Sequence, residues 1–276
     1  MTTTNSESTN VSYKPAINEL AGIISGWRIW CILAWDDIRL RYRRSSLGPF
    51  WITISMAVKI YFMGFLYGHL FKVDIAQYFP FLASGIITWT TASTIIIESS
   101  HVFVESESYL RNMKVSYAHL IMRVIMRNVI IFAHNILAYI PIILYFGHSL
   151  INFQLTNVLV FIPNLFIMIL NCILIGTVLA ILSTRFRDMP IIVDSLLQVI
   201  FFVTPIMWLP SLLPERLSWL AVYNPMYHII NSVRAPLLGQ PVALESYLCL
   251  ALVTIASFIS FYYLMNRCKY RIIFWL

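Results

Sequence analysis

The stretch that decides the fold is FWITISMAVKIYFMGFLYGHLF, residues 50–71, whose only charged residue is Lys59. A transmembrane helix needs about 20 mainly apolar residues, so this stretch is long enough to cross a bilayer. Five later runs meet the same criterion, which predicts six crossings in total. These runs are residues 78–97, 124–146, 158–182, 191–209 and 242–265.

The composition of the whole chain agrees with this expectation. Of the 276 residues, 59% are hydrophobic and 11% are charged, and the mean hydropathy is +0.78. Soluble domains carry about 25% charged residues, which excludes an ordinary water-soluble protein. The four cysteines show no CxxC spacing, so neither a metal site nor a disulfide framework is indicated. We therefore predict an all-α integral membrane protein.

The distribution of the 19 lysines and arginines gives the orientation. A net charge of +7 would also suit a nucleic-acid partner, but the basic residues cluster on one side of the predicted spans. All of them fall there except Lys59, Lys72, Arg216 and Arg234. Because basic residues are retained in the cytoplasm, both termini are expected to be cytoplasmic, and no nucleic-acid partner is expected.

The chain divides into four parts on this basis. Residues 1–26 are polar and lack the basic start and apolar core of a secretory signal, so we expect a partly disordered cytoplasmic N-terminus. Residues 27–47 form an amphipathic helix, residues 48–266 form the six-helix transmembrane domain, and residues 267–276 form a cytoplasmic tail.

The segment WRIWCILAWDDIRLRYRRSS, residues 27–46, predicts a helix lying on the inner leaflet. At 100° per residue Trp27, Trp35 and Ile38 share one apolar face, while Asp36, Asp37 and the arginines lie mostly opposite. Ile29, Leu33 and Leu40 form a second apolar stripe, which a purely lipid-bound helix would expose to water. The segment is therefore either a membrane anchor or a docking site for a cytoplasmic partner, or both.

The inner loop, residues 98–123, places acidic residues ahead of basic ones and includes apolar side chains such as Phe103 and Tyr109. It predicts either a solvated loop or a short amphipathic helix that contacts a partner. Its carboxylates accompany neither an apolar pocket nor a metal-ligand set, so a catalytic role is rejected.

The outer segment, residues 210–241, is too apolar for a free loop. Its proline-bounded pieces are too short to cross a membrane, which favours short interfacial or re-entrant helices between the fifth and sixth spans.

Three ionisable groups lie at membrane depth: Lys59, His134 and Asp194. Inserting a charge there costs on the order of 3 kcal/mol, so such residues face a bundle interior or water. Lys59 could snorkel or form an ion pair, but its central position favours a polar pathway. Nearby aromatic residues would suit the stacking faces of sugars, although composition does not separate this from lipid-facing packing.

No segment matches GxxxxGK[ST], the phosphate-binding loop of many ATPases. Uphill transport would then draw energy from a separate ATPase or an ion gradient. No acidic pair occupies the membrane centre to bind an ion, so a partner ATPase is favoured.

Four stretches carry a resemblance to a known family: LAWDDIRLRYRRSSLGPFW (33–51), RFRDMP (185–190), TPIMW (204–208) and YNPMYHIINSVRAPLLG (223–239). In order and spacing, the chain resembles the permease subunit of ABC-2 type transporters, most closely those that export O-antigen and other polysaccharides. The resemblance extends from about residue 25 to the end.

The resemblance implies a homodimer paired with two cytoplasmic ATPase subunits, which would bind the ATP and Mg²⁺ that this chain does not. The complex would export undecaprenyl-diphosphate-linked polysaccharide across the bacterial inner membrane, and this chain would be a permease rather than an enzyme. The alternatives are export of teichoic acid, capsule, lipid or drug, or a non-transporting membrane scaffold.

The resemblance also suggests four groups of functional residues. Contact with the lipid diphosphate at the inner leaflet is expected from Arg39, Arg41, Arg43 and Arg44. Docking of the ATPase is expected at Trp35, Ile38, Glu105, Tyr109 and Arg111. The conduit is expected to contain Lys59, Tyr61, Phe62, Phe65, Trp89, Phe201 and Phe202. The outer gate is expected to contain Trp219, Tyr223, Asn224, Tyr227, His228 and Arg234.

Overall fold

A computed structural model describes residues 19, 22–24, 26–112, 115–146, 155–212, 214–217 and 219–276, and over these residues every regular element is a helix. Most of the predicted N-terminal region, 1–26, and the outer loop at 147–154 lie outside the described residues. The elements are α2 (Trp27–Arg41), α3 (Phe50–Leu70), α4 (Ile75–Glu105), α5 (Glu107–Asn112), α6 (Tyr117–Phe146), α7 (Leu155–Arg185), α8 (Met189–Val203), η2 (Pro210–Leu212), η3 (Glu215–Leu217), α9 (Trp219–Val222), α10 (Pro225–Leu237), α11 (Leu244–Cys268), η4 (Lys269–Arg271) and α12 (Ile272–Trp275).

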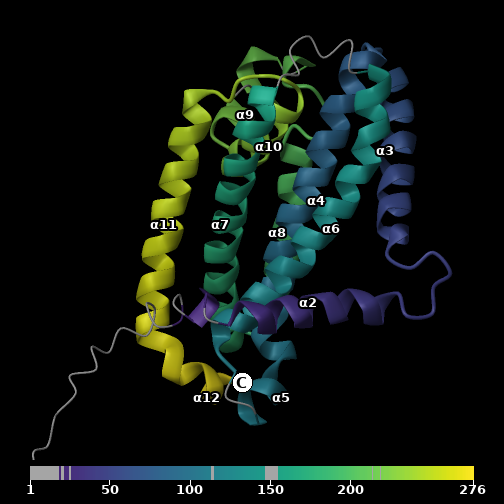
Figure 1. Cartoon of the computed structure of the whole chain (residues 1–276). Coiled ribbons are helices and arrows are strands. Elements are labelled where there is room, and N and C mark those ends of the chain that lie inside the picture. The colour runs from purple at the N-terminus through teal and green to yellow at the C-terminus, as the bar shows by residue number, and fades with distance from the viewer. Residues whose placement is uncertain are drawn as a thin grey trace, which may run out of the picture.

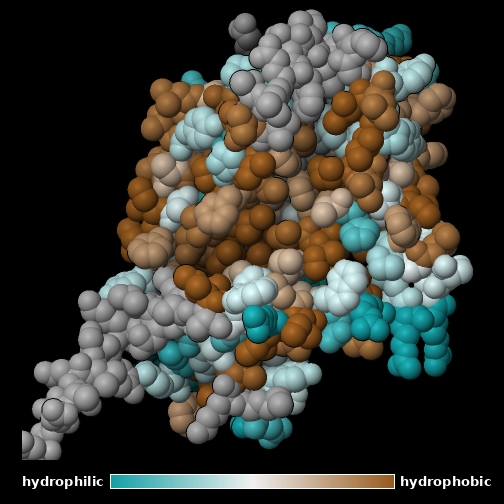
Figure 2. All heavy atoms as spheres, viewed as in Figure 1, coloured by the Kyte–Doolittle hydropathy of each residue, from teal (hydrophilic) through white to brown (hydrophobic). Residues whose placement is uncertain are grey.

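The long helices run alongside one another as a bundle, with α2 lying across one end and α9 and α10 at the other (Figure 1). The helices α5 and α12 and the C-terminus lie at the same end as α2. On the face that Figure 2 shows, hydrophobic side chains cover the middle of the molecule, whereas hydrophilic ones gather at the α2 end. This banding is what a bilayer requires of the surface that it surrounds.

Within the part of the chain that the structure describes, five helices are long and apolar enough to cross a membrane, namely α3, α4, α6, α7 and α11. They confirm the expected spans at 50–71, 78–97, 124–146, 158–182 and 242–265, most of them with longer ends. In particular, α4 continues to Glu105 and so takes in the first part of the predicted inner loop, and α5 supplies a short helix after it.

The span expected at 191–209 differs from the structure, because α8 ends at Val203 after only 15 residues. Thr204 is extended (φ −83°, ψ 133°) and precedes Pro205. A proline clashes with a helical conformation at the preceding residue and cannot donate a backbone hydrogen bond, so the helix stops there. At 1.5 Å per residue α8 is about 22 Å long, shorter than the hydrocarbon core.

Most of α4 is buried, and it packs against α3, α6, α7, α8 and α10. The contact with α3 uses a stripe of residues spaced four apart, which includes Ile60, Gly64 and Gly68. A Cβ atom on Gly64 would lie 2.7 Å from the ring of Phe79 on α4. Small residues four apart let transmembrane helices approach closely, and this GxxxG pair fixes the position of α3 against α4.

The helix predicted over residues 27–46 is present as α2, but it ends earlier, at Arg41. Its buried residues are Ala34 and Ile38, and it packs against α6. Trp27 and Trp35, expected on the same face, are exposed, as is Leu40 of the second stripe. Asp37 was expected on the polar face, but it points to the bundle, because its carboxylate meets two arginines of α6.

Candidate functional site

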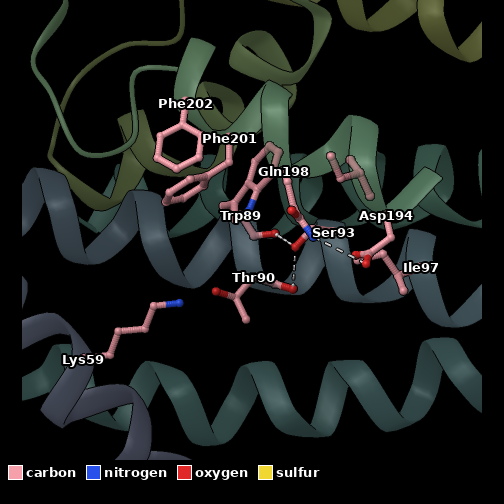
Figure 3. A pocket seen from close by; sticks show the side chains of 10 residues that line it. Lys59, Trp89, Thr90, Ser93, Ile97, Asp194, Gln198, Phe201 and Phe202 are labelled. Carbon is pink, nitrogen blue, oxygen red and sulfur yellow. Dashed lines mark hydrogen bonds between the residues drawn. The ribbon is translucent and has the colours of Figure 1, made fainter. Parts of the chain in front are cut away.

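A cavity of about 400 Å³ lies where α3, α4 and α8 meet, and we call it the lateral groove (Figure 3). Lys59 comes from α3, the four residues Trp89, Thr90, Ser93 and Ile97 come from α4, and the rest come from α8. The residues from α8 are Asp194, Leu197, Gln198, Phe201 and Phe202.

Aromatic rings form one end of the lateral groove. The ring centroids of Trp89 and Phe201 are 5.5 Å apart, and those of Phe201 and Phe202 are also 5.5 Å apart. Trp89 is buried, whereas Phe202 is 70% exposed. The rings therefore form a continuous apolar surface that begins inside the bundle and reaches its periphery.

The polar side chains of the lateral groove differ in how well they are hydrogen-bonded within the protein. The Ser93 hydroxyl donates to the carbonyl oxygen of Trp89 over 2.8 Å, within its own helix. The Gln198 amide donates to the Asp194 carboxylate over 3.5 Å, which is a long and weak contact. This amide and this carboxylate therefore leave capacity for other partners.

Lys59 is the tenth residue of α3 and is exposed. Its amino group points into the lateral groove (Figure 3). Among the residues that the structure describes, it has neither a hydrogen bond nor an ion pair. An unpaired lysine halfway along an apolar span requires water or an anion beside it, and the groove is where that partner would lie.

The structure brings four of the expected conduit residues together: Lys59, Trp89, Phe201 and Phe202. The other three, Tyr61, Phe62 and Phe65, do not line the groove. Phe62 and Phe65 are 67% and 64% exposed on the uncovered face of α3, and Tyr61 packs toward Phe79 with ring centroids 6.1 Å apart. Thr90 and Gln198 line the groove and were not expected, because a lone polar residue in a span gives no signal of its direction.

An ionic cluster joins α2 to α4 and α6 near the α2 end of the bundle. The Asp37 carboxylate accepts hydrogen bonds from Arg123 at 2.8 and 2.5 Å and from Arg127 at 2.7 Å. Arg127 also donates to Glu98 at 2.8 Å, and the Asn128 amide donates to the same carboxylate at 2.6 Å. The cluster therefore anchors α2 on the bundle.

The contacts of the ionic cluster shift the pKa of Asp37. Burial acts to raise it, but the hydrogen bonds and positive charges of Arg123 and Arg127 outweigh burial and hold the pKa below its usual value. The cluster was missed at the sequence level. The sequence does contain a signal for it. Arg123 and Arg127 are four residues apart, so they share one face of a helix, and the segment before that helix carries acidic residues.

A second cavity of about 400 Å³ lies beside the ionic cluster, at the ends of α4 and α6. It is lined by Arg41, Glu98, Glu105 and Tyr109, among others. Glu105 and Tyr109, two of the residues predicted for docking, therefore line the same cavity, and Arg111 pairs with Glu107 over 2.7 Å on α5. Ile38 is only 2% exposed, so its side chain supports α2 and is not available to a partner, whereas Trp35 is exposed.

The four arginines expected at the inner leaflet are all exposed, on the last turn of α2 and the residues after it: Arg39, Arg41, Arg43 and Arg44. Arg41 approaches Glu98 to 4.0 Å, which is at the limit of an ion pair. Such exposed cations are free to attract anionic groups.

Some of the residues expected at an outer gate are accessible at the surface, whereas others are held in place by hydrogen bonds. Trp219 and Tyr223 are exposed, and Tyr227 is half-buried. Asn224 caps α10 by accepting from the Met226 amide over 3.0 Å, and it donates to Thr204 over 2.8 Å. His228 is buried between Ser246 and the Val222 carbonyl.

Arg234 is fully buried. Its guanidinium donates to the carbonyl oxygen of Pro205 over 2.6 Å and to the Asn231 side chain over 3.3 Å, and it lies 4.1 Å from the ring centroid of Phe81. It therefore joins α10 to α4 and to the end of α8, which is a structural role that sequence reasoning did not foresee.

Comparison with known proteins places this architecture. The family model described as ABC-2 type transporter matches residues 28–238. The chain belongs to the ABC-2 type transporter family. The matched part begins in α2 and ends just after α10, so it contains the lateral groove, the ionic cluster and Arg234. ABC-2 permeases are transmembrane subunits, in keeping with the long apolar helices of this chain.

Individual ABC-2 relatives are distant but cover most of the chain. An O-antigen export system permease protein RfbA from Klebsiella pneumoniae is 23% identical over 239 residues, covering 85% of this chain and 90% of the relative. A protein of the same description from Myxococcus xanthus is 22% identical over 201 residues, covering 72% of this chain and 76% of the relative.

Proposed function

We propose that this chain is the permease subunit of an ABC transporter that exports undecaprenyl-diphosphate-linked polysaccharide of the O-antigen type across the bacterial inner membrane. Membership of the ABC-2 family and the description of its relatives support the class of transporter. The lateral groove is the single observation in this chain that carries the choice of substrate, because aromatic faces beside polar groups suit a sugar chain.

In this proposal the chain crosses the membrane six times with both termini in the cytoplasm. The segment 204–209 extends α8 toward the outer surface and completes the fifth crossing. The pieces from η2 to α10 form the outer re-entrant segment. The four exposed arginines at the α2 end then lie at the cytoplasmic leaflet, where basic residues are retained and where a lipid diphosphate would be attracted: Arg39, Arg41, Arg43 and Arg44.

Two copies of the chain would form the working conduit. The apolar faces of α3 and α8 on either side of the lateral groove are uncovered, as Phe62, Leu196 and Phe202 illustrate. A second copy that packs there through a two-fold axis would bring two grooves together between the protomers. The polymer would then move past many weak stacking sites instead of one tight site.

A separate ATPase subunit, which binds ATP and Mg²⁺, would dock at the α2 end. The cavity lined by Glu105 and Tyr109, together with exposed Trp35 and the α5 pair of Arg111 and Glu107, offers the contact surface. Since the ionic cluster ties α2 to α4 and α6, a push on α2 would be passed to α4, which lines the groove.

Purification from the native membrane tests the proposal. We expect an ATPase subunit to co-purify in a 1:1 ratio with this chain and to hydrolyse ATP faster when the lipid-linked glycan is added. Deleting that subunit should make the glycan accumulate on the cytoplasmic side. A chain that purifies alone and stable, or glycan that still reaches the surface without the ATPase, would refute it.

A further inference from the structure

The feature that the family match leaves unexplained is the charge in the lateral groove. Lys59 lies centrally in an apolar span and points into a cavity of about 400 Å³. Asp194 of the same chain lines that cavity too, but Lys59 forms no ion pair with it or with any other described residue. A stacking surface for neutral sugars needs no cation. Since an unpaired charge at this depth of a membrane is costly, its presence indicates a partner that arrives from elsewhere.

We propose that Lys59 forms an anion subsite in the lateral groove, which binds a carboxylate or phosphate group carried by the translocated molecule. The proposal rests on the proposed transport function for the identity of that molecule, and it makes an acidic substrate part of the specificity. The charged group would be held at the Lys59 end while the apolar faces of adjoining sugar rings lie on Trp89 and Phe201.

The groups around Lys59 fit a transient anion better than a permanent one. Thr90, from α4, lies at the same end of the groove as the Lys59 amino group and offers a hydroxyl. Further along the groove, the Gln198 amide makes one long hydrogen bond of 3.5 Å, to Asp194, among the described residues. One flexible lysine with neutral donors holds an anion by charge without the fixed geometry of an arginine fork. Such a site can release its ligand, as transport requires.

Asp194 of a second copy is the competing partner for Lys59. In Figure 3 the Lys59 amino group lies toward Thr90, whereas the Asp194 carboxylate lies toward Ile97. Seven residues separate Thr90 from Ile97 on α4, which is about 10 Å along the helix axis. A two-fold axis parallel to the bundle preserves depth, so Asp194 of a second copy would also lie toward the Ile97 end of the groove, away from the Lys59 amino group.

The first experiment measures anion attraction without any substrate. The four native cysteines, Cys31, Cys172, Cys249 and Cys268, are replaced, Thr90→Cys is introduced, and the full complex is kept in membrane vesicles. The introduced thiol is then modified with an anionic and with a neutral methanethiosulfonate of similar size. Lys59→Gln should lower the ratio of the anionic to the neutral rate about fivefold, because a nearby positive charge is lost, whereas Lys59→Arg should keep it.

The matched control is Lys72→Gln. Lys72 is also exposed and follows the same helix, but it lies in the turn between α3 and α4, outside the groove. It should leave the rate ratio at the introduced thiol unchanged. An equal ratio in the Lys59→Gln and parent proteins would overturn the subsite.

The second experiment identifies the source of the anion by measuring how far the glycan protects the introduced thiol from modification. Lipid-linked glycan from the native cell is used intact, after reduction of its carboxyl groups to alcohols, or after removal of its lipid diphosphate. Protection that depends on Lys59 and disappears on carboxyl reduction assigns the subsite to acidic sugars, whereas disappearance on diphosphate removal assigns it to the lipid linkage. Equal protection in the Lys59→Gln and parent proteins with every form overturns the proposal.

The two experiments separate the subsite from the transport function. If no form of the glycan protects the introduced thiol or stimulates ATP hydrolysis while the Lys59-dependent rate ratio persists, the glycan-export function fails and the groove still attracts anions. If the glycan is exported and the rate ratio is independent of Lys59, export stands and the subsite fails.

Discussion

Lys59 and Arg234 are both cations in apolar surroundings, and neither has an acidic partner among the described residues, yet their environments differ. Arg234 is 1% exposed and its guanidinium is held by the Pro205 carbonyl and the face of Phe81. Lys59 is exposed and points into an open cavity. The difference indicates that the fold itself holds one cation, through two of its three guanidinium nitrogens, and leaves the other for a ligand.

The largest effect that tests this comparison is expected for Arg234→Met. The substitution leaves the buried Pro205 carbonyl without its donor and should lower the free energy of unfolding by about 3 kcal/mol. Arg234→Lys should also destabilise the protein, because an ammonium group cannot stack on Phe81 as a planar guanidinium does. Thermal unfolding of the purified protein measures both.

Arg216→Gln is the control for Arg234. It removes an exposed arginine in η3 and should leave the melting temperature unchanged. Arg234→Met with a wild-type melting temperature would show that the buried cation is not a structural one, and the contrast with Lys59 would break down.

The next effect concerns the packing that holds Lys59 on the groove. Gly64→Leu would drive a side chain into the Phe79 ring, where even a Cβ atom would lie only 2.7 Å away, and should cost about 2 kcal/mol. Gly68→Ala is the matched control, since its Cβ would meet Ile75 at an ordinary 3.5 Å. If both variants unfold at the same temperature, the close approach of Gly64 to Phe79 does not stabilise the packing of α3 on α4.

A third prediction concerns the ionic cluster, whose side chains are neither fully buried like Arg234 nor exposed like Lys59. Asp37→Asn should weaken the attachment of α2 by about 1 to 2 kcal/mol, a value reduced because the cluster is partly exposed to solvent. Hydrogen exchange of α2 amides measures the loss. Asp36→Asn is the neighbouring control, because Asp36 makes no ion pair among the described residues; equal exchange in the two variants would contradict the assignment.

The pH dependence of the same helix follows from the lowered pKa of Asp37. A carboxylate whose pKa is lower in the folded state stabilises that state fully above its unfolded pKa of about 3.9, and this stabilisation is lost as pH falls through the folded value. Exchange protection of α2 should therefore decline only below about pH 4 in the parent protein. In Asp37→Asn this decline should be smaller, and an equal decline would count against the ion pairs.

The smallest expected change in stability belongs to Lys59→Met, which should alter the free energy of unfolding by less than about 0.5 kcal/mol, because no contact within the chain is lost. Transport should nevertheless fall. Thermal unfolding and surface polymer are measured on the same samples. A marked loss of stability would mean that Lys59 is structural, as Arg234 is.

Much of the fold could be read from the sequence because it follows from local composition. Five apolar runs became long helices, and the amphipathic segment became α2. The end of α8 at Val203 was also encoded locally, by Pro205, but the apolar residues beyond it hid the break. The faces of α2 were less predictable, because Asp37 is drawn inward by arginines 86 and 90 residues away in the sequence.

The candidate site was only partly predictable for the same reason. Lys59 was identified from its position in an apolar span, and Trp89 and Phe201 from the family resemblance, but Phe62 and Phe65 on the same helix as Lys59 face outward. A helix that is apolar on all sides gives no periodic signal of which side faces its neighbours. The three-helix geometry of α3, α4 and α8 made that choice.

The sequence by itself determined that the protein is helical and membrane-embedded, because apolar length and the placement of charge act locally along the chain. Only the tertiary structure decided which cation is held within the fold and which is left open to a ligand. Arg234 and Pro205 are 29 residues apart, and Lys59 and Gln198 belong to different helices, so no local pattern relates them. Whether a charge finds its partner within the fold depends on how the helices pack, and that packing separates the structural arginine from the lysine proposed to bind a ligand.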